Sequence, residues 1–554
     1  MTTKLSSSGP TPADVVTLTA SCLCNIRSNS TIGFQTKLAF PRSSFPLPLD
    51  LCHCSTCRAS LGTCFASMVK LPPVSAAADN IVTSSNDGSK RKQLSERTQR
   101  PWPMGEMPQT LRRYKSSDTA ARYFCGMCGT CLWMHYGDED GPSHTTNATD
   151  DSGTAGKISM QKEEDVWFVT TGSLELADAE GEAIEAMFKV VSHIYVEDTK
   201  DGGVAVLAGH SLPNSDATKD ATEIPSYYRR GSPRITRSEL ISQLSYASTH
   251  INPHTNEREN PLVAQCHCRT VTLLISPPDI PSSYPPEAWN AWAEALDPPP
   301  HNRHAHTHST SQAALQALRD SEVTDTPKFD DRDVWWLRPS LVTNRNTGNS
   351  STKRNRLLVA TCACDSCRRG SGTEVQQWVF TPTGCISVVL RPSSARSSES
   401  EDTEAHPVTV PWSAVVPHLP VASRPQITST ASASFPEGYS LPFEAYESSP
   451  GTHRGFCGTC GATIFWSGKQ HGEMWPEEDR RNTIDISAGL VSGAGTVSDG
   501  ASISVGSRRD EWLDWRSNYV TNLKDYEAKR RGDLGRRIQA GARSEQWLKG
   551  LGGA

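Results

Sequence analysis

The stretch that decides the fold is Tyr114–Gly129, YKSSDTAARYFCGMCG, because its pattern returns at Tyr446–Gly461 as YESSPGTHRGFCGTCG. Both stretches read Y-x-S-S-x-x-x-x-R-x-F-C-G-x-C-G, and every fixed residue and every gap agrees between them. Chance does not produce agreement over so long a pattern, so the chain contains an internal repeat. Each copy of such a repeat is expected to form one structural unit.

The repeat extends upstream of the quoted stretch. Cys52–Gly62 and Cys362–Gly372 share the pattern C-x-C-x-x-C-R-x-x-x-G. A C-x-C pair precedes each of them, and these pairs are Cys22/Cys24 and Cys266/Cys268. Each copy therefore carries C-x-C, C-x-C-x-x-C and C-x-x-C in that order. Together the two copies contain fourteen of the chain's 17 cysteines.

The composition fits two folded modules accompanied by polar segments. The chain has 554 residues, of which 36% are hydrophobic, and its mean hydropathy is -0.49. So low an apolar content indicates disordered segments beside the folded ones. The net charge of -6 gives no electrostatic reason to expect nucleic acid or an anionic membrane as a partner.

Cysteine usage and the N-terminus bear on the compartment. No run of about 18 apolar residues occurs, so no membrane span is expected. The N-terminal MTTKLSSSGPTPADVV lacks the apolar core of a signal peptide. Cysteines clustered at C-x-C and C-x-x-C spacing in a chain without an export signal indicate metal binding rather than disulfides. We therefore expect a cytoplasmic protein, with the nucleus as the alternative.

Short runs of strand-forming residues between glycine and cysteine turns predict a mainly β chain. A short helix is expected at 183–190, another at 236–247, and a solvated helix from Tyr519 onward. The clearest expected strands are 15–20, 65–71, 132–136, 166–171, 193–196 and 378–382.

The repeat and the composition divide the chain into five parts. They are a disordered tail at 1–14, a first module at 15–205, a linker at 206–259, a second module at 260–515 and a charged tail at 516–554. The second module carries insertions near 280–350 and 392–435, which are rich in proline or in serine and threonine. Its end echoes the first copy faintly, since DISAGL at 485–490 parallels VTTGSL at 169–174, and SISV at 502–505 parallels HIYV at 193–196.

The seven cysteines of each copy divide naturally into a set of four and a set of three. Zinc in structural sites prefers four thiolates, whereas zinc in reactive sites keeps one position open. Spacing alone does not fix the pairing, but the compact C-x-C-x-x-C element is the better candidate for three thiolates. On the residues alone, a purely structural role for all seven is an equal alternative. The closed sets would be Cys22, Cys24, Cys125, Cys128 and Cys266, Cys268, Cys457, Cys460; the open sets would be Cys52, Cys54, Cys57 and Cys362, Cys364, Cys367.

Other residues of the repeat allow two interpretations. Arg122 and Arg454 can hold a substrate carboxylate or pair with a local acid, and the second role is favoured. The repeated serines can donate hydrogen bonds to cysteine sulfurs or cap turns; they are Ser116, Ser117, Ser448 and Ser449. Three cysteines without a counterpart are expected to be small buried apolar residues: Cys64, Cys131 and Cys385. A histidine cluster, His301, His304, His306 and His308, lies in a proline-rich insertion, where a metal site is not favoured.

The succession of C-x-C, C-x-C-x-x-C-R, Y-x-S-S and R-x-F-C-x-x-C-G resembles the glutathione-dependent formaldehyde-activating enzyme family, which includes centromere protein V. The resemblance covers roughly 15–205 and 260–515 apart from the insertions. Gly172–Leu174 and His193–Val196 are also similar to the family's C-terminal signature. It implies a β-tent of small antiparallel sheets in each module, with a structural zinc in the closed set and a catalytic zinc in the open set.

The resemblance further implies a carbon–sulfur lyase that adds glutathione reversibly to formaldehyde. Up to two zinc ions per module and a small thiol substrate are expected. Metal lowers the pKa of a bound thiol, so Cys52, Cys54, Cys57 or Cys362, Cys364, Cys367 would hold the metal that binds the attacking sulfur. No separate general base stands out, and Ser502 in place of His193 leaves room for one silent copy. The alternatives are a lyase for another thiol or electrophile and a non-enzymatic zinc scaffold that binds a protein or chromatin partner.

Overall fold

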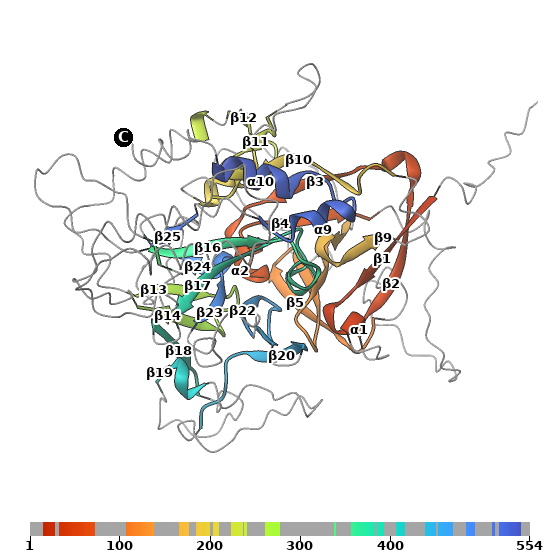
Figure 1. Cartoon of the computed structure of the whole chain (residues 1–554). Helices are drawn as coiled ribbons and strands as arrows, with labels where there is room; N and C mark the ends of the chain where they lie inside the picture. The colour runs from red at the N-terminus through yellow and green to blue at the C-terminus, as the bar shows by residue number, and fades with distance from the viewer. Residues whose placement is uncertain are drawn as a thin grey trace, which may run out of the picture.

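The structure is a computed structural model that describes the repeated segments of both expected modules (Figure 1). The tail 1–14 and the histidine cluster 301–308 lie outside the described residues, as do most of the insertions near 280–350 and 392–435. Within the described part of the chain, no helix is both long and apolar enough to cross a membrane. The described residues are 15–27, 33–71, 107–137, 166–176, 184–199, 203–209, 223–236, 238–240, 261–276, 337–338, 356–382, 385–392, 406–415, 438–449, 452–468, 483–492, 512–515 and 520–543.

The described residues are mainly β, which confirms the predicted fold class. In the first copy a nine-stranded sheet has the order β12-β11-β10-β3-β4-β8-β7-β6-β5, beside a three-stranded sheet β2-β1-β9. All pairs are antiparallel except that β10 runs parallel to β3 and β11. The strands are β1 (Val15–Ser21), β2 (Gln35–Pro41), β3 (Leu47–Cys52), β4 (Ala66–Lys70), β5 (Leu111–Ser117), β6 (Ala120–Cys125), β7 (Cys131–Tyr136), β8 (Val166–Thr170), β9 (Leu174–Leu176), β10 (Phe188–Ile194), β11 (Ser226–Tyr227) and β12 (Arg234–Ile235).

The second copy repeats this plan. Its large sheet has the order β15-β16-β17-β23-β22-β21-β20, with β25 and β26 added in parallel to β16, and its smaller sheet is β19-β18-β14-β13-β24. The strands are β13 (Leu262–Gln265), β14 (Thr272–Ile275), β15 (Leu337–Arg338), β16 (Arg356–Cys362), β17 (Gln376–Pro382), β18 (Ile386–Leu390), β19 (Val408–Pro411), β20 (Glu444–Ser449), β21 (Thr452–Phe456), β22 (Thr463–Ser467), β23 (Thr483–Ser487), β24 (Val491–Ser492), β25 (Leu513–Asp514) and β26 (Val520–Thr521).

The helices are short, and the sequence did not predict the two that matter most for the site. These are α2 (Ser55–Leu61) and α8 (Asp365–Ser371), which follow the C-x-C pairs directly. Each ends at a glycine in the left-handed region, Gly62 with φ 76° and Gly372 with φ 81°, as helices commonly do. The remaining α-helices of the described residues are α1 (Leu23–Arg27), α4 (Ala205–Ala208), α9 (Leu523–Ala528) and α10 (Leu534–Arg543).

The structure revises how the ends of the two copies correspond. In the first copy β10 lies beside β3, and the His53 amide donates to Ile194 O at 2.9 Å. In the second copy β26 takes this position beside β16, and the Ala363 amide donates to Thr521 O at 3.0 Å. Residues 502–505, expected as the counterpart of 193–196, lie outside the described residues. The register instead makes Val520 the counterpart of His193.

A second revision shifts the preceding segment by one residue. Met68 of β4 pairs with Thr170, and the equivalent Trp378 of β17 pairs with Ser487. Gly172 therefore corresponds to Gly489, whereas the sequence comparison had set Gly489 against Ser173. The expected helix at 183–190 is also wrong, because β10 begins at Phe188 and pairs with β3.

The two copies pack against each other reciprocally. A Cβ atom at Gly129 would lie 2.5 Å from the Phe456 side chain, and one at Gly461 would lie 2.5 Å from Phe124. Both glycines have φ 77°. Because Phe124 and Phe456 hold the same place in the repeat, this is the exchange of contacts that a two-fold dimer interface has. The F-C-G-x-C-G pattern is thus explained by the contact between the copies as well as by its cysteines.

Hydrogen bonds from backbone amides to side chains of the other copy repeat this exchange. The Cys64 amide donates to the Gln377 side chain at 3.2 Å, and the Glu374 amide donates to the Ser67 hydroxyl at 3.0 Å. Cys64 and Glu374 are equivalent positions. Leu51 and Phe65 of the first copy belong to the same buried apolar cluster as the core of the second. One hydrophobic core cluster therefore extends across both modules, and a second cluster lies within the first module.

The C-terminal segment packs into the fold rather than forming the solvated helix expected from Tyr519. Tyr526 and Ile538 are buried, and Arg531 is fully buried. The Arg531 guanidinium donates to Glu374 of the second copy and to the carbonyl oxygens of Thr171 and Leu174 of the first. Figure 1 shows α9 and α10, at the blue end of the chain, lying over elements of the first copy.

Candidate metal centres

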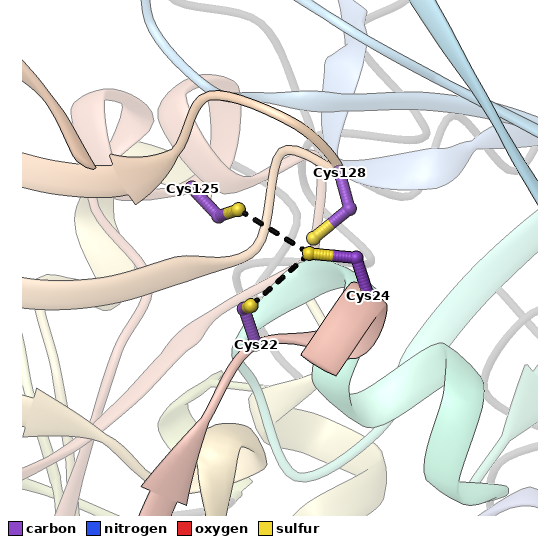
Figure 2. Close-up of side chains that lie close together, drawn as sticks. All are labelled: Cys22, Cys24, Cys125 and Cys128. Carbon is purple, nitrogen blue, oxygen red and sulfur yellow. Dashed lines mark hydrogen bonds between the residues drawn. The ribbon is translucent and has the colours of Figure 1, made fainter. Parts of the chain in front are cut away.

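The closed set of the first copy brings four sulfurs together from two parts of the chain (Figure 2). Cys22 and Cys24 come from the junction of β1 and α1, and Cys125 and Cys128 from the turn between β6 and β7. All four are buried, and their Sγ atoms lie within 4.8 Å of one another. The Sγ of Cys24 lies 3.3 Å from that of Cys22 and 3.6 Å from that of Cys125. Four buried sulfurs at such spacing fit a tetrahedral metal site.

The closed set of the second copy repeats this geometry. Cys266, Cys268, Cys457 and Cys460 have their Sγ atoms within 4.8 Å of one another. The Sγ of Cys268 lies 3.5 Å from that of Cys266 and 3.4 Å from that of Cys457. The Val271 amide donates to Cys266 Sγ at 3.3 Å, as the Phe34 amide donates to Cys22 Sγ at 3.1 Å. Amide donors of this kind stabilise sulfur in its charged, metal-binding form.

Each open set lies where a strand passes into a helix. Cys52 ends β3, Cys54 is the N-cap of α2 and Cys57 lies in its first turn. The Cys57 amide donates to Cys54 Sγ at 3.3 Å, so the helix start itself orients the thiols. Cys52 and Cys54 are half-buried, whereas Cys57 is buried. The second open set, Cys362, Cys364 and Cys367, has the same arrangement, with the Cys367 amide 3.4 Å from Cys364 Sγ.

A buried arginine contacts each open set. Arg122 Nη2 donates to Cys57 Sγ at 3.1 Å, and Arg454 Nη2 donates to Cys367 Sγ at 3.6 Å. The sequence favoured pairing with a local acid; the observed partner is instead the cysteine. In each arginine, Nε and Nη1 have no hydrogen-bond partner among the described residues. Buried cations of this kind fit a set of anionic thiolates, because each charge compensates the other.

In each open set the pKa of one thiol is lowered, and the charge of the neighbouring arginine contributes to this. Hydrogen bonds from Cys52 and Cys54 lower the pKa of the Cys57 thiol, and the charge of Arg122 lowers it further against the effect of burial. The pKa of Cys364 is lowered in the same way by Cys362 and Cys367, with Arg454 again helping. Each open set therefore has at least one thiol that is readily deprotonated, which metal binding requires.

The remaining residues of the repeat have structural partners. Ser116 Oγ donates to Ala120 O at 3.3 Å and Ser448 Oγ to Thr452 O at 3.5 Å, which favours the turn-capping interpretation. Cys64 is buried in the core shared by the modules, and Cys385 is half-buried before β18. Cys131 is buried in the same cluster as Cys57. None of these three belongs to a metal-binding group among the described residues.

A buried histidine pair lies behind the first open set only. His53 Nε2 is 3.0 Å from His193 Nδ1, and both residues are fully buried. Burial lowers the pKa of His193 to about 3 and lowers that of His53 well below its ordinary value, so both rings are neutral. The second copy has Ala363 and Val520 in these positions. The pair supports the Cys52–Cys54 loop from inside the first module.

The linings of the two open sets differ, and this difference was not visible in the sequence comparison. In each large sheet, a row of directly paired residues runs across the strands from the arginine that contacts the sulfur. In the first copy the row is Arg122, Met134, Phe168 and Lys70. In the second it is Arg454, Trp466, Asp485 and Phe380.

Asp485 is therefore a candidate functional residue that sequence reasoning missed. The parallel drawn between 485–490 and 169–174 set Asp485 against Val169, an ordinary core position. Aligning Gly489 with Gly172 would have placed it opposite Phe168. The signal that was available is the acid itself, which interrupts the apolar run TIDIS of β23.

None of the protein-family models, curated proteins or solved structures compared with this chain matches it.

Proposed function

We propose that the protein is a zinc-dependent carbon–sulfur lyase that adds glutathione, or a related small thiol, reversibly to formaldehyde or a similar small electrophile. The observation that carries the proposal is that each copy pairs a set of four sulfurs with a separate set of only three. Structural zinc takes four protein ligands, whereas zinc that takes part in chemistry keeps a position for substrate.

The donor sets fit zinc. Sulfur ligands select zinc, copper(I) or iron–sulfur clusters over hard cations. The closed sets, Cys22, Cys24, Cys125, Cys128 and Cys266, Cys268, Cys457, Cys460, would hold structural ions. The open sets, Cys52, Cys54, Cys57 and Cys362, Cys364, Cys367, would hold the ions that meet substrate. A bound ion there would supply Lewis acidity that lowers the pKa of an incoming thiol.

The residues of the chain supply the rest of the chemistry. Arg122 and Arg454 fix one sulfur of each open set through a hydrogen bond and place a positive charge beside it. The amides of Cys57 and Cys367 orient a second sulfur. The buried cysteines of the two sets limit access of water, while half-buried Cys52 and Cys54 in the first set and Cys364 in the second leave a sulfur within reach of a thiol. The thiolate sulfur then attacks the carbonyl carbon, and in reverse it leaves with the bonding electron pair.

Metal content of the native protein, measured with and without reduced glutathione, tests this proposal. Four zinc ions per chain are expected, one for each cysteine set. Cobalt substitution should give an absorption band from sulfur ligation that changes when glutathione is added. Exchange spectroscopy by NMR should show that the protein accelerates interconversion of glutathione and its hydroxymethyl adduct.

Three serine variants assign the roles of the sets. Cys54→Ser and Cys364→Ser should each remove one zinc and leave a folded chain, whereas Cys125→Ser should destabilise the first module. Two zinc ions per chain, unaffected by glutathione, together with no acceleration of the exchange, would contradict the lyase proposal. That result would favour the non-enzymatic zinc scaffold.

A further inference from the structure

Asp485 lies on the side of its sheet that faces the second open set. Successive side chains of a strand point to opposite faces, and the neighbours Ile484 and Ile486 belong to the core shared by the modules. Trp466, which is paired directly with Asp485, packs against Cys362 and Cys367. The carboxyl group therefore lies on the face that carries the three sulfurs.

The positive charge of Arg454 acts on both the carboxyl group and the sulfurs. Its guanidinium donates to Cys367 Sγ and to Ser366 Oγ, and its charge is the one that acts on Asp485. Asp485 is only 6% exposed. Burial raises its pKa to about 8 against the effect of Arg454, so the group is protonated at neutral pH. A neutral carboxylic acid in this position can donate a hydrogen bond.

Packing alone does not explain an acid at this position. A buried carboxyl group costs free energy that an apolar side chain does not, and the first copy has Phe168 in the same place of the row. The flanking Trp466 and Phe380 provide no hydrogen-bond acceptor through their rings. A buried acid where an apolar residue is expected, beside a candidate metal centre, is typical of functional sites.

We propose that Asp485 is the proton-transfer residue of the second open set, and that catalysis resides in the second module. The inference rests on the proposed lyase function. In the first copy Met134 and Phe168 take the positions of Trp466 and Asp485 and can neither give nor take a proton, and Lys70 at the end of the row is exposed.

The step is balanced by the reactants alone. The thiol loses its proton, and its sulfur forms a bond to the carbonyl carbon while the C=O π pair moves to oxygen. Asp485 gives its proton to that oxygen, which yields the hydroxymethyl thioether. The proton lost by the thiol returns the carboxylate to its acid form. In the reverse direction the carboxylate takes the hydroxyl proton as the C–S bond breaks.

Two substitutions separate binding from proton transfer. Asp485→Asn keeps a hydrogen-bond donor but cannot transfer a proton, and Asp485→Leu removes both capacities. Asp533→Asn is the matched control, because it makes the same chemical change in a carboxylate bonded to Arg537 beside α10. All three are made in the full chain carrying Cys54→Ser, so that only the second open set binds thiol.

The first readout does not depend on turnover. In the cobalt-loaded protein, 2-mercaptoethanol and ethanethiol are compared as ligands, since they differ by the hydroxyl group that Asp485 would contact. The parent and Asp485→Asn should bind 2-mercaptoethanol more tightly, by up to roughly tenfold. Asp485→Leu should bind the two thiols equally. Discrimination by Asp485→Leu at the parent's level would overturn the inference.

The second readout is the rate of adduct exchange. The exchange rate of Asp485→Asn should be at least about 100-fold below that of the parent, since this is the usual contribution of a general acid. Asp533→Asn should keep the parent rate. A parent rate in Asp485→Asn, or in the full chain carrying Cys364→Ser alone, would overturn the inference. If the parent discriminates between the thiols through Asp485 but accelerates no exchange, the contact with ligand stands and the lyase function fails.

Discussion

At the scale of single residues, Arg122 of β6 donates a hydrogen bond to a sulfur of the first open set. We predict that Arg122→Met lowers the metal affinity of this set by about 10–100-fold, the usual effect of losing a group that orients a metal ligand. The metal affinity of Arg122→Lys should lie between those of the unchanged protein and Arg122→Met, because lysine keeps the charge but lacks the planar fork of donors. Competition with a coloured chelator measures the affinity.

The same protein contains the control for this prediction. Arg454 still contacts the second open set in Arg122→Met, and neither arginine belongs to a closed set. One of the four metal ions should therefore leave early while three are retained. Equal loss from all four sets would show that the substitution disturbs the fold, and unchanged affinity would show that the hydrogen bond to Cys57 has no effect on metal.

Sequence reasoning reached the cysteines and missed their surroundings for a physical reason. C-x-C and C-x-x-C spacings fix local geometry, so the four sets that they suggested are the four that the structure brings together. The partner of Arg122 and the position of Asp485 depend on strand register instead. A one-residue slip in register moves a side chain to the other face of a sheet, and such a slip hid Asp485.

At the scale of elements, the turn after each C-x-x-C pair is constrained by the other copy. We predict that Gly129→Ala lowers the free energy of unfolding by at least about 2 kcal/mol. The left-handed conformation costs an alanine roughly 1–2 kcal/mol, and a Cβ atom 2.5 Å from Phe456 adds an overpacking cost. Urea denaturation followed by tryptophan fluorescence measures the loss.

Gly231 separates the two costs. It has φ 82° in the turn between β11 and β12, and a Cβ atom there would meet nothing within 4 Å. Gly231→Ala should therefore show the conformational cost alone. If both variants lose the same stability, the contact with Phe456 does not constrain the turn. Gly461→Ala, which meets Phe124, should behave as Gly129→Ala does.

Elements were predictable from the sequence where their pattern is local. The strand expected at 132–136 lies within β7, and that at 378–382 lies within β17, because a short run of apolar and aromatic residues marks both. The helix expected at 183–190 failed because β3 offers Phe188 and its successors a parallel partner. Helices α2 and α8 carry too few residues to show a helical period, so only their glycine C-caps hinted at them.

At the scale of the whole molecule, the two modules behave as one unit. Glu175 of the first copy lies within salt-bridge distance of Arg368 and Arg369 of the second and of Arg531 from the C-terminal segment. Burial would raise the pKa of Glu175, but the charges of these arginines outweigh it and hold the pKa below its ordinary value. The carboxylate thus joins three parts of the chain at one point.

The sign of the pH dependence follows from this shift. A carboxyl group with a lowered pKa in the folded state binds fewer protons there than in the unfolded chain, so it stabilises the fold above the unfolded value. That stability is complete above about pH 4.3, the ordinary pKa of glutamate. It is lost as the pH falls through the lowered value of the folded state.

Glu175→Gln should therefore destabilise the chain at neutral pH by roughly 3–5 kcal/mol. The substitution removes the carboxylate that pairs with buried Arg369, and it leaves Arg368 and Arg531 with Asp365 and Glu374 as partners. The deficit should shrink as the pH falls below about 4.3. Denaturation of the variant and the unchanged protein at each pH measures the difference in their free energies of unfolding. Release of metal at low pH affects both proteins and therefore cancels in this difference. Glu527→Gln is the control, since its pair with Arg536 is partly exposed and contributes about 0–1 kcal/mol. A deficit for Glu175→Gln that stays constant down to pH 3 would contradict the lowered pKa, and with it the role of this carboxylate in holding the modules together.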